Sequence, residues 1–196
     1  MTRAFSATGL ALTAVFVGII AALGLVPALA VPGVAVPITL QTLGVMLAGA
    51  VLGRWRGAAA VVVFLLLVAL GLPLLAGGRG GLGVFFGPSA GFLVGFPVAA
   101  FVIGWLSERL DTARSLAKGI AVNVVGGIVV LYLFGIAGMA LVLHLSLLQA
   151  ATAALVFLPG DVIKAVLAAL VARGAHQAVP GLLPEMPRAD REPVGV

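Results

Sequence analysis

The feature that most constrains this chain is how rarely a charged side chain interrupts it. Residues 4–53 contain no Asp, Glu, Lys or Arg, and charged residues make up only 9% of the 196-residue sequence, against 63% hydrophobic ones. Soluble domains carry about 25% charged residues because their surfaces face water. So few charges exclude a soluble enzyme, a disordered chain and a nucleic-acid-binding protein. We therefore expect the lipid bilayer to surround most of the protein.

Prolines, glycines and charges divide the apolar sequence into segments near the roughly 20 residues that cross a bilayer as a helix. The sequence predicts an all-α, polytopic integral membrane protein with six transmembrane helices in one domain, residues 1–176. A Pro- and charge-rich cytoplasmic tail, residues 177–196, follows it. The expected spans cover residues 7–26, 37–53, 57 to 72 or 75, 91–106, 119–134 and 161–173.

Two features predict breaks late in the chain. Gly135 and Gly138 are expected to end the fifth span, after which residues 139–157 form a short outer helix. Pro159-Gly160 is expected to leave the sixth span discontinuous.

The basic residues predict the orientation. Cytoplasmic loops are rich in Lys and Arg, and nine such residues fall on one side of the six-span arrangement, whereas the other side has only Arg79. Both termini are therefore expected in the cytoplasm, and the loops 27–37, 73–90 and 135–148 outside. The nine residues are Arg3, Arg54, Arg56, Arg109, Arg114, Lys118, Arg173, Arg188 and Arg191.

Asp161 and Lys164 are the only charges within a predicted span. Three residues apart, they share a helix face. Ionisable groups at the bilayer centre cost about 2.5–3.5 kcal/mol each on insertion scales and commonly mark a functional path. If a helix restarts after Pro159-Gly160, Asp161 caps it and the positive helix end faces an anionic ligand. The plainer alternative is a structural ion pair that locks the last span to its neighbours.

A glycine-rich loop follows the third span. Gly78, Gly80 and Gly83 match G-x-G-x-x-G, but the pattern indicates a dinucleotide site only within a βαβ unit, which this sequence lacks. We interpret the loop as a flexible outer lid, with Phe85 and Phe86 as apolar cover. An ordinary connecting loop is the alternative.

Other motifs are weaker. Gln41 and the threonines beside it either line a pocket or only connect helices by hydrogen bonds. In the first span, Ala7, Ala11 and Ala14 recur at a spacing that lets another helix approach closely. The sequence has no cysteine and no metal-ligand spacing, so no metal or cofactor is expected, and it has no constellation typical of an enzyme. Without a phosphate-binding loop, active transport would draw energy from a partner or an ion gradient.

Four blocks together resemble the BioY family, the biotin-capturing S components of energy-coupling factor (ECF) transporters. They are VPITLQTLGVMLAGAVLG (36–53), GLPLLAGGRGGLGVFFGPSAGFLVGF (71–96), YLFG (132–135) and PGDVIKAVLAA (159–169). The resemblance implies a multi-pass protein of the bacterial inner membrane that takes biotin from outside into a lidded pocket. It implies an ECF coupling transmembrane subunit and ATPase subunits as partners, and biotin as substrate rather than cofactor. A self-sufficient carrier, a purely structural subunit and a homo-oligomer stay open.

By position, the resemblance implies three sets of functional residues. The biotin-binding set is Asp161, Lys164, Arg79, Gln41, Phe85 and Tyr132. The lid set is Gly78, Gly80, Gly81, Gly83, Phe86, Gly87 and Pro88, and the docking set is Ala7, Ala11 and Ala14. Lys164 or Arg79 would meet the biotin carboxylate and Asp161 the ureido N–H groups. Which polar end meets which residue stays open at this point.

Overall fold

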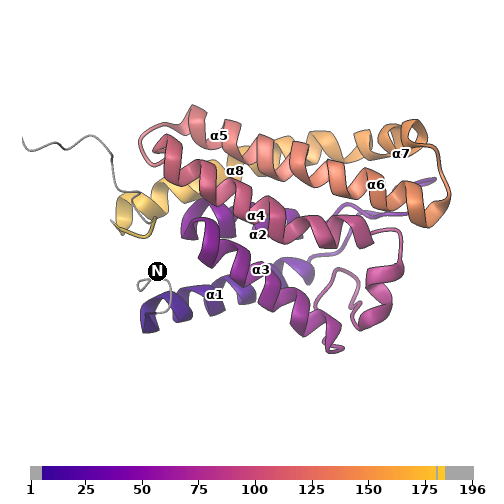
Figure 1. Cartoon of the computed structure of the whole chain (residues 1–196), viewed down its shortest axis with the longest axis horizontal. Coiled ribbons are helices and arrows are strands. Elements are labelled where there is room, and N and C mark those ends of the chain that lie inside the picture. The colour runs from indigo at the N-terminus through magenta and orange to yellow at the C-terminus, as the bar shows by residue number, and fades with distance from the viewer. Residues whose placement is uncertain (1–5, 180, 184–196) are drawn as a thin grey trace, which may run out of the picture.

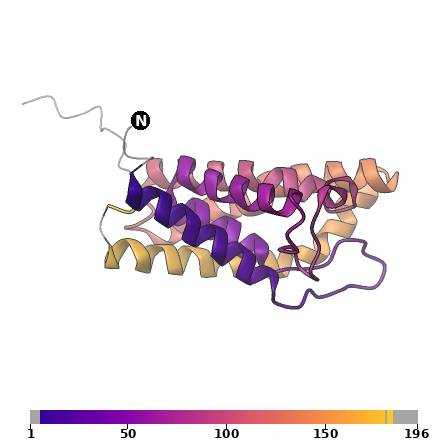
Figure 2. The same cartoon turned by 90° about the horizontal axis from the view of Figure 1, so that it is seen from below.

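The computed structural model describes residues 6–179 and 181–183, and its elements are helical, as the sequence predicts. Figures 1 and 2 show the helices running lengthwise through the molecule. The elements are α1 (Ala7–Gly24), α2 (Gln41–Leu52), α3 (Arg54–Ala69), the 3-10 helix η1 (Leu82–Phe86), α4 (Ala90–Leu110), α5 (Leu116–Val124), the π-helix η2 (Val125–Val130), α6 (Leu131–Leu143), α7 (Leu147–Ala154), the 3-10 helix η3 (Leu155–Phe157) and α8 (Leu158–Ala178).

Because α5, η2 and α6 follow one another directly, as do α7, η3 and α8, the described chain forms six main helical stretches, of which α2 is the shortest. Four of them are long and apolar enough to cross a membrane: Ala7–Gly24, Ala90–Leu110, Leu116–Leu143 and Leu147–Ala178. This is the architecture of a multi-pass membrane protein.

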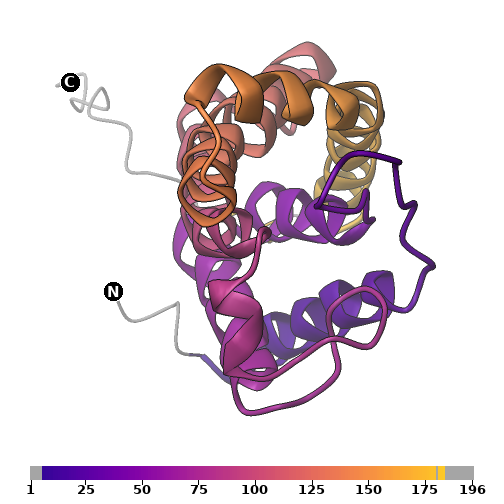
Figure 3. The same cartoon turned by 90° about the vertical axis from the view of Figure 1, so that its right-hand side faces the viewer.

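Three connections lie at one end of the molecule, which we call the loop end: residues 25–40, 70–89 and 144–146. The start of α1 and the end of α8 lie together at the opposite end (Figure 1). The loop end faces the viewer in Figure 3.

The short helix α2 occupies the middle of the bundle, where it packs against α1, α3, α4 and α8. Its side chains Val45, Met46 and Leu52 are almost fully buried. It begins at Gln41, four residues later than expected, and its 12 residues extend only about 18 Å at 1.5 Å per residue. The missing length lies at the loop end, where side chains rather than a helix fill the centre.

The expected helix end at Gly135 and Gly138 is wrong, because α6 continues to Leu143. These glycines mark close packing instead. A Cβ on Gly135 would collide with the ring of Phe92, and a Cβ on Gly91 of α4 would lie 2.8 Å from the Cα of Gly138. Small residues let membrane helices approach in this way, while the helical hydrogen bonds stay intact.

The expected break at Pro159-Gly160 is also displaced. The 3-10 turn η3 interrupts the helix earlier, and α8 then starts with Pro159 in its first turn, where proline is tolerated. The capping prediction for Asp161 is wrong, since Phe157 occupies the N-cap position and Asp161 lies inside α8.

The helix α8 reaches Ala178, two residues beyond the predicted end of the domain. Arg3, Arg188, Arg191 and the tail from residue 184 lie outside the described residues.

Candidate functional site

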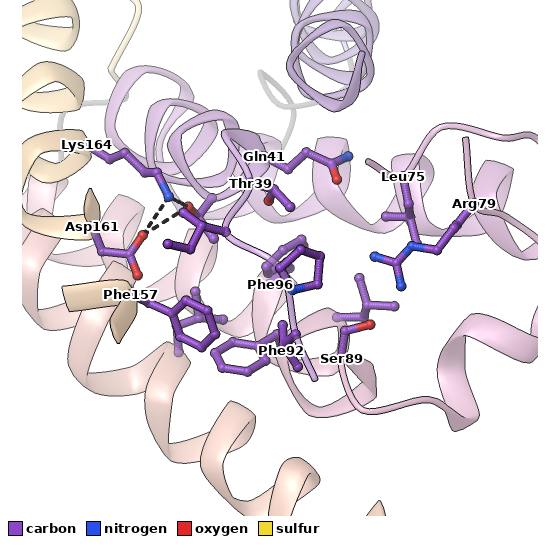
Figure 4. Close-up of a pocket in the computed structure, with 16 residues that line it drawn as sticks. Thr39, Gln41, Leu75, Arg79, Ser89, Phe92, Phe96, Phe157, Asp161 and Lys164 are labelled. Carbon is purple, nitrogen blue, oxygen red and sulfur yellow. Dashed lines mark hydrogen bonds and ion pairs between the residues drawn. The ribbon is translucent and has the colours of Figure 1, made fainter. Parts of the chain in front are cut away.

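A pocket lies at the loop end, above the start of α2 and between α4, α6 and α8 (Figure 4). The space between its walls is about 600 Å³ when the open mouth is included. It is lined by Val36, Pro37, Ile38, Thr39, Gln41, Thr42, Leu75, Arg79, Ser89, Phe92, Leu93, Phe96, Leu131, Phe157, Asp161 and Lys164.

The two charges predicted within the last span form an ion pair at the inner end of this pocket. Lys164 Nζ lies 2.8 Å from Asp161 Oδ1, and the residues are only 5% and 4% exposed. One helical turn of α8 separates them, as their spacing predicts. Two buried opposite charges this close neutralise each other, so the pair adds no net charge to the pocket.

Neighbouring helices complete the hydrogen bonds of this pair. The Tyr132 hydroxyl on α6 donates to Asp161 Oδ2 at 2.9 Å. Lys164 Nζ donates to Thr42 Oγ1 on α2 at 3.0 Å. The Thr42 hydroxyl in turn donates to Asp161 Oδ1 at 3.4 Å. An ammonium has three N–H donors and a carboxylate about four acceptor positions. One donor of Lys164 and about one acceptor position of Asp161 are therefore left for a ligand.

Three aromatic rings form the apolar wall of the pocket. Phe92 and Phe96 stand four residues apart on one face of α4, and Phe157 lies just before α8. The Phe92 and Phe157 rings meet edge to face with centroids 5.8 Å apart. Our sequence interpretation missed these rings, although the i, i+4 pair directly after the lid was a usable signal.

The lid loop is anchored on both sides of a tight turn. Leu75 and Arg79 exchange backbone hydrogen bonds of 3.0 and 3.2 Å across Gly77 and Gly78, whose φ angles of 79° and 69° favour glycine. The N–H of Gly81 then donates to the carbonyl of Val68 at the end of α3. The lid is thus an ordered loop held against α3.

Arg79 places a positive charge at the mouth of the pocket. Its backbone belongs to the lid, its Nε donates to the carbonyl of Ala76 at 3.2 Å, and its guanidinium extends toward Ser89 across the pocket (Figure 4). Within residues 6–179 and 181–183, Arg79 forms no salt bridge. Unlike Lys164, it therefore keeps its charge available for an anion.

Not every predicted binding residue faces the pocket. Gln41 lines it, yet both polar atoms of its amide bind backbone groups of the lid. Phe85 and Phe86 line a separate, open groove on the outer face of α3, and Phe86 is 79% exposed. Tyr132 is absent from the lining and reaches the site through Asp161.

A second covering segment was missed at the sequence level. Residues 25–40 pass over the loop end (Figure 3), and Leu29 and Ile38 exchange two backbone hydrogen bonds of 2.9 Å. Residues 36–39 of this segment all line the pocket. The three prolines at 27, 32 and 37 were a signal of extended backbone.

Comparisons with known proteins point to one family. Residues 1–181 match the model of the BioY family. The biotin transporter BioY of Rhizobium etli is 52% identical over 184 residues, covering 91% of this chain and 98% of that protein. The biotin transporter BioY of Rhodobacter capsulatus is 53% identical over 182 residues, covering 88% and 95%. A crystal structure of the S-component for biotin from an ECF-type ABC transporter aligns with a TM-score of 0.85 and 31% identity, over 90% of this chain and 95% of that one.

Proposed function

The chain belongs to the BioY family, and we propose from this membership that it is a biotin transporter, the membrane subunit that captures biotin for an ECF-type transporter. The observation that carries the proposal is the pocket itself. A buried Asp161–Lys164 pair, an aromatic wall and the free charge of Arg79 suit the ureido group, the bicycle and the carboxylate of biotin. The named relatives are transporters rather than enzymes.

The charge arrangement supports one direction for the bound biotin. Lys164 is already neutralised by Asp161, whereas Arg79 lacks a carboxylate partner in the described chain. The biotin carboxylate therefore binds Arg79 at the mouth, where a guanidinium can hold it with two hydrogen bonds. The ureido ring lies deeper, with its N–H groups donating to Asp161 and its carbonyl accepting from Lys164. The bicycle packs on the rings of Phe92 and Phe157.

The loop end faces outward from the bacterial inner membrane, and the six helical stretches are six spans with both termini in the cytoplasm. This arrangement is supported by the basic residues at the opposite end of the bundle: Arg54 starts α3, Arg109 lies in the last turn of α4, Lys118 in the first turn of α5, and Arg173 near the end of α8.

The exposed small-residue face of α1 is the surface on which the coupling transmembrane subunit docks. Ala7, Ala11 and Ala14 are exposed, and a Cβ added to Gly18 would meet nothing within 4 Å. Such a face lets a partner helix approach closely. ATPase subunits bound to that partner supply the energy for release into the cytoplasm.

Binding and uptake experiments test this function together. Purified protein in detergent should bind biotin saturably, and biotinol, in which an alcohol replaces the carboxylate, more weakly. Cells should lose biotin uptake when the genes for the coupling and ATPase subunits are deleted. A protein that binds no biotin would refute the function, and undiminished uptake without the partners would identify a self-sufficient carrier.

A further inference from the structure

Gln41 supplies the amide side chain among the residues that line the pocket. It is 3% exposed, its Nε2 donates to the carbonyl of Leu74 at 3.1 Å, and its Oε1 accepts from the N–H of Ala76 at 3.1 Å. These two bonds satisfy backbone groups of residues that belong to no helix. The amide thus faces the lid backbone, to which each of its two polar atoms is bonded.

Gln41 binds the lid at the segment that carries Arg79. Leu74 and Ala76 flank Leu75, so the amide makes the pair of bonds that a neighbouring strand would make. Leu75 is in turn paired with Arg79 by two backbone hydrogen bonds, and the carbonyl of Ala76 accepts from Arg79 Nε. The three residues 74–76 therefore contact Gln41 on one side and Arg79 on the other.

The end of helix α1 also packs against Leu74 and Gln41. A Cβ on Gly24, the last residue of α1, would collide with the carbonyl oxygen of Leu74 and lie 2.9 Å from Gln41 Nε2. The lid segment is thus wedged between the ends of two helices, α1 and α2. Its position depends on the Gln41 amide and on the absence of a side chain at position 24.

We propose that Gln41 is a positioning residue for the anionic end of the ligand: it fixes residues 74–76 and so holds the guanidinium of Arg79 over the mouth of the pocket. The inference rests on the proposed binding of biotin with its carboxylate at Arg79. It replaces the direct ligand contact that the sequence suggested for Gln41. Losing the amide should weaken recognition of the carboxylate while recognition of the bicycle is retained.

The test compares biotin with biotinol on full-length protein in detergent. Gln41→Met keeps the length of the side chain and removes both hydrogen bonds. We expect it to weaken biotin binding about tenfold, as loss of a hydrogen bond to a charged group commonly does, and to leave biotinol binding within about twofold. Arg79→Gln should also weaken the binding of biotin and spare that of biotinol. The double variant should bind biotin as tightly as Arg79→Gln alone, because both changes remove the same interaction with the carboxylate.

Two controls separate positioning from general destabilisation. Asn123→Leu removes another buried amide, which binds the carbonyl of Gly119 within its own helix, and it should keep the wild-type ratio of the two affinities. Gln41→Glu retains an acceptor for the Ala76 N–H and should recover part of the preference for biotin.

A ligand-independent measurement reads the lid directly. Releasing residues 74–76 should speed tryptic cleavage after Arg79 in Gln41→Met, relative to cleavage after the exposed Arg114 in the same chain. Three results would overturn the role of Gln41 and leave the proposed function standing. They are an equal loss of affinity for biotin and biotinol, additive effects of Gln41→Met and Arg79→Gln on biotin affinity, and an unchanged rate of cleavage after Arg79. Wild-type protein that binds no biotin would instead refute the proposed function, and the inference with it.

Discussion

The hydroxyl of Tyr132 on α6 donates to Asp161 Oδ2 on α8, while the other oxygen of that carboxylate, Oδ1, lies 2.8 Å from Lys164. The two oxygens of Asp161 thus have different partners on different helices. A buried carboxylate held in this way has one orientation rather than several, which prepares it to accept a ligand N–H. The tyrosine therefore orients a pocket residue although it does not itself line the pocket.

Variants of the buried ion pair allow its effect on ligand binding to be distinguished from its effect on stability. Asp161→Ala leaves the Lys164 ammonium buried without its counter-charge and should lower the free energy of unfolding by about 3–5 kcal/mol, with loss of biotin binding. The double variant Asp161→Leu/Lys164→Met removes both charges and should recover most of the stability but none of the binding. Thermal unfolding and biotin titration in detergent measure the two effects. Biotin affinity retained in the double variant would identify the pair as purely structural.

Thr42 is predicted to matter through its hydroxyl group. Thr42→Val keeps the shape but removes the acceptor for Lys164 and the donor to Asp161. Hydrogen bonds to charged groups contribute about 1.5–3 kcal/mol, so biotin affinity should fall at least tenfold. Thr42→Ser keeps the hydroxyl and is the matched control. Equal losses in the two variants would assign the effect to packing instead of hydrogen bonding.

The close contact of α4 with α6 should not tolerate a methyl group. A Cβ on Gly91 would collide with the carbonyl oxygen of Phe134, so Gly91→Ala should destabilise the protein by about 1–3 kcal/mol. The control is Gly174→Ala in α8, where nothing lies within 4 Å and alanine should be neutral or stabilising. Thermal unfolding curves of the two variants in detergent compare their stabilities. If Gly91→Ala unfolds like wild type, the helices are not packed this closely.

The exposed face of α1 should affect transport and not binding. Ala14→Trp places a large ring on the proposed docking surface, on a helix that contributes no residue to the pocket lining, and should abolish biotin uptake in cells while detergent-solubilised protein binds biotin normally. Leu141→Trp on the exposed face of α6 is the control and should leave both activities intact. Normal uptake by Ala14→Trp would place the docking surface elsewhere.

The successful sequence predictions concern local patterns, and the failures concern contacts between distant segments. Asp161 and Lys164 were found because a charge in an apolar helix is costly wherever it occurs. Gly135 was misinterpreted as a helix end because its reason, the ring of Phe92, lies on another helix.

The same limit applies to Gln41, whose partners are backbone atoms 33 and 35 residues away in a loop. The spacing of residue types along a sequence does not predict where such backbone atoms lie. Phe85 was expected at the ligand because of its place in the lid. The loop instead turns that ring toward the surface of α3.

The pairing of Asp161 with Lys164 has an electrical consequence. Since those two charges cancel, the empty pocket carries one positive charge, that of Arg79, and a ligand with a single carboxylate brings the total to zero. Moving one elementary charge through a membrane potential of 100 mV involves about 2.3 kcal/mol. A loaded pocket without net charge would involve no such work if it moved through that field, whereas the empty pocket would carry the single charge of Arg79 through it.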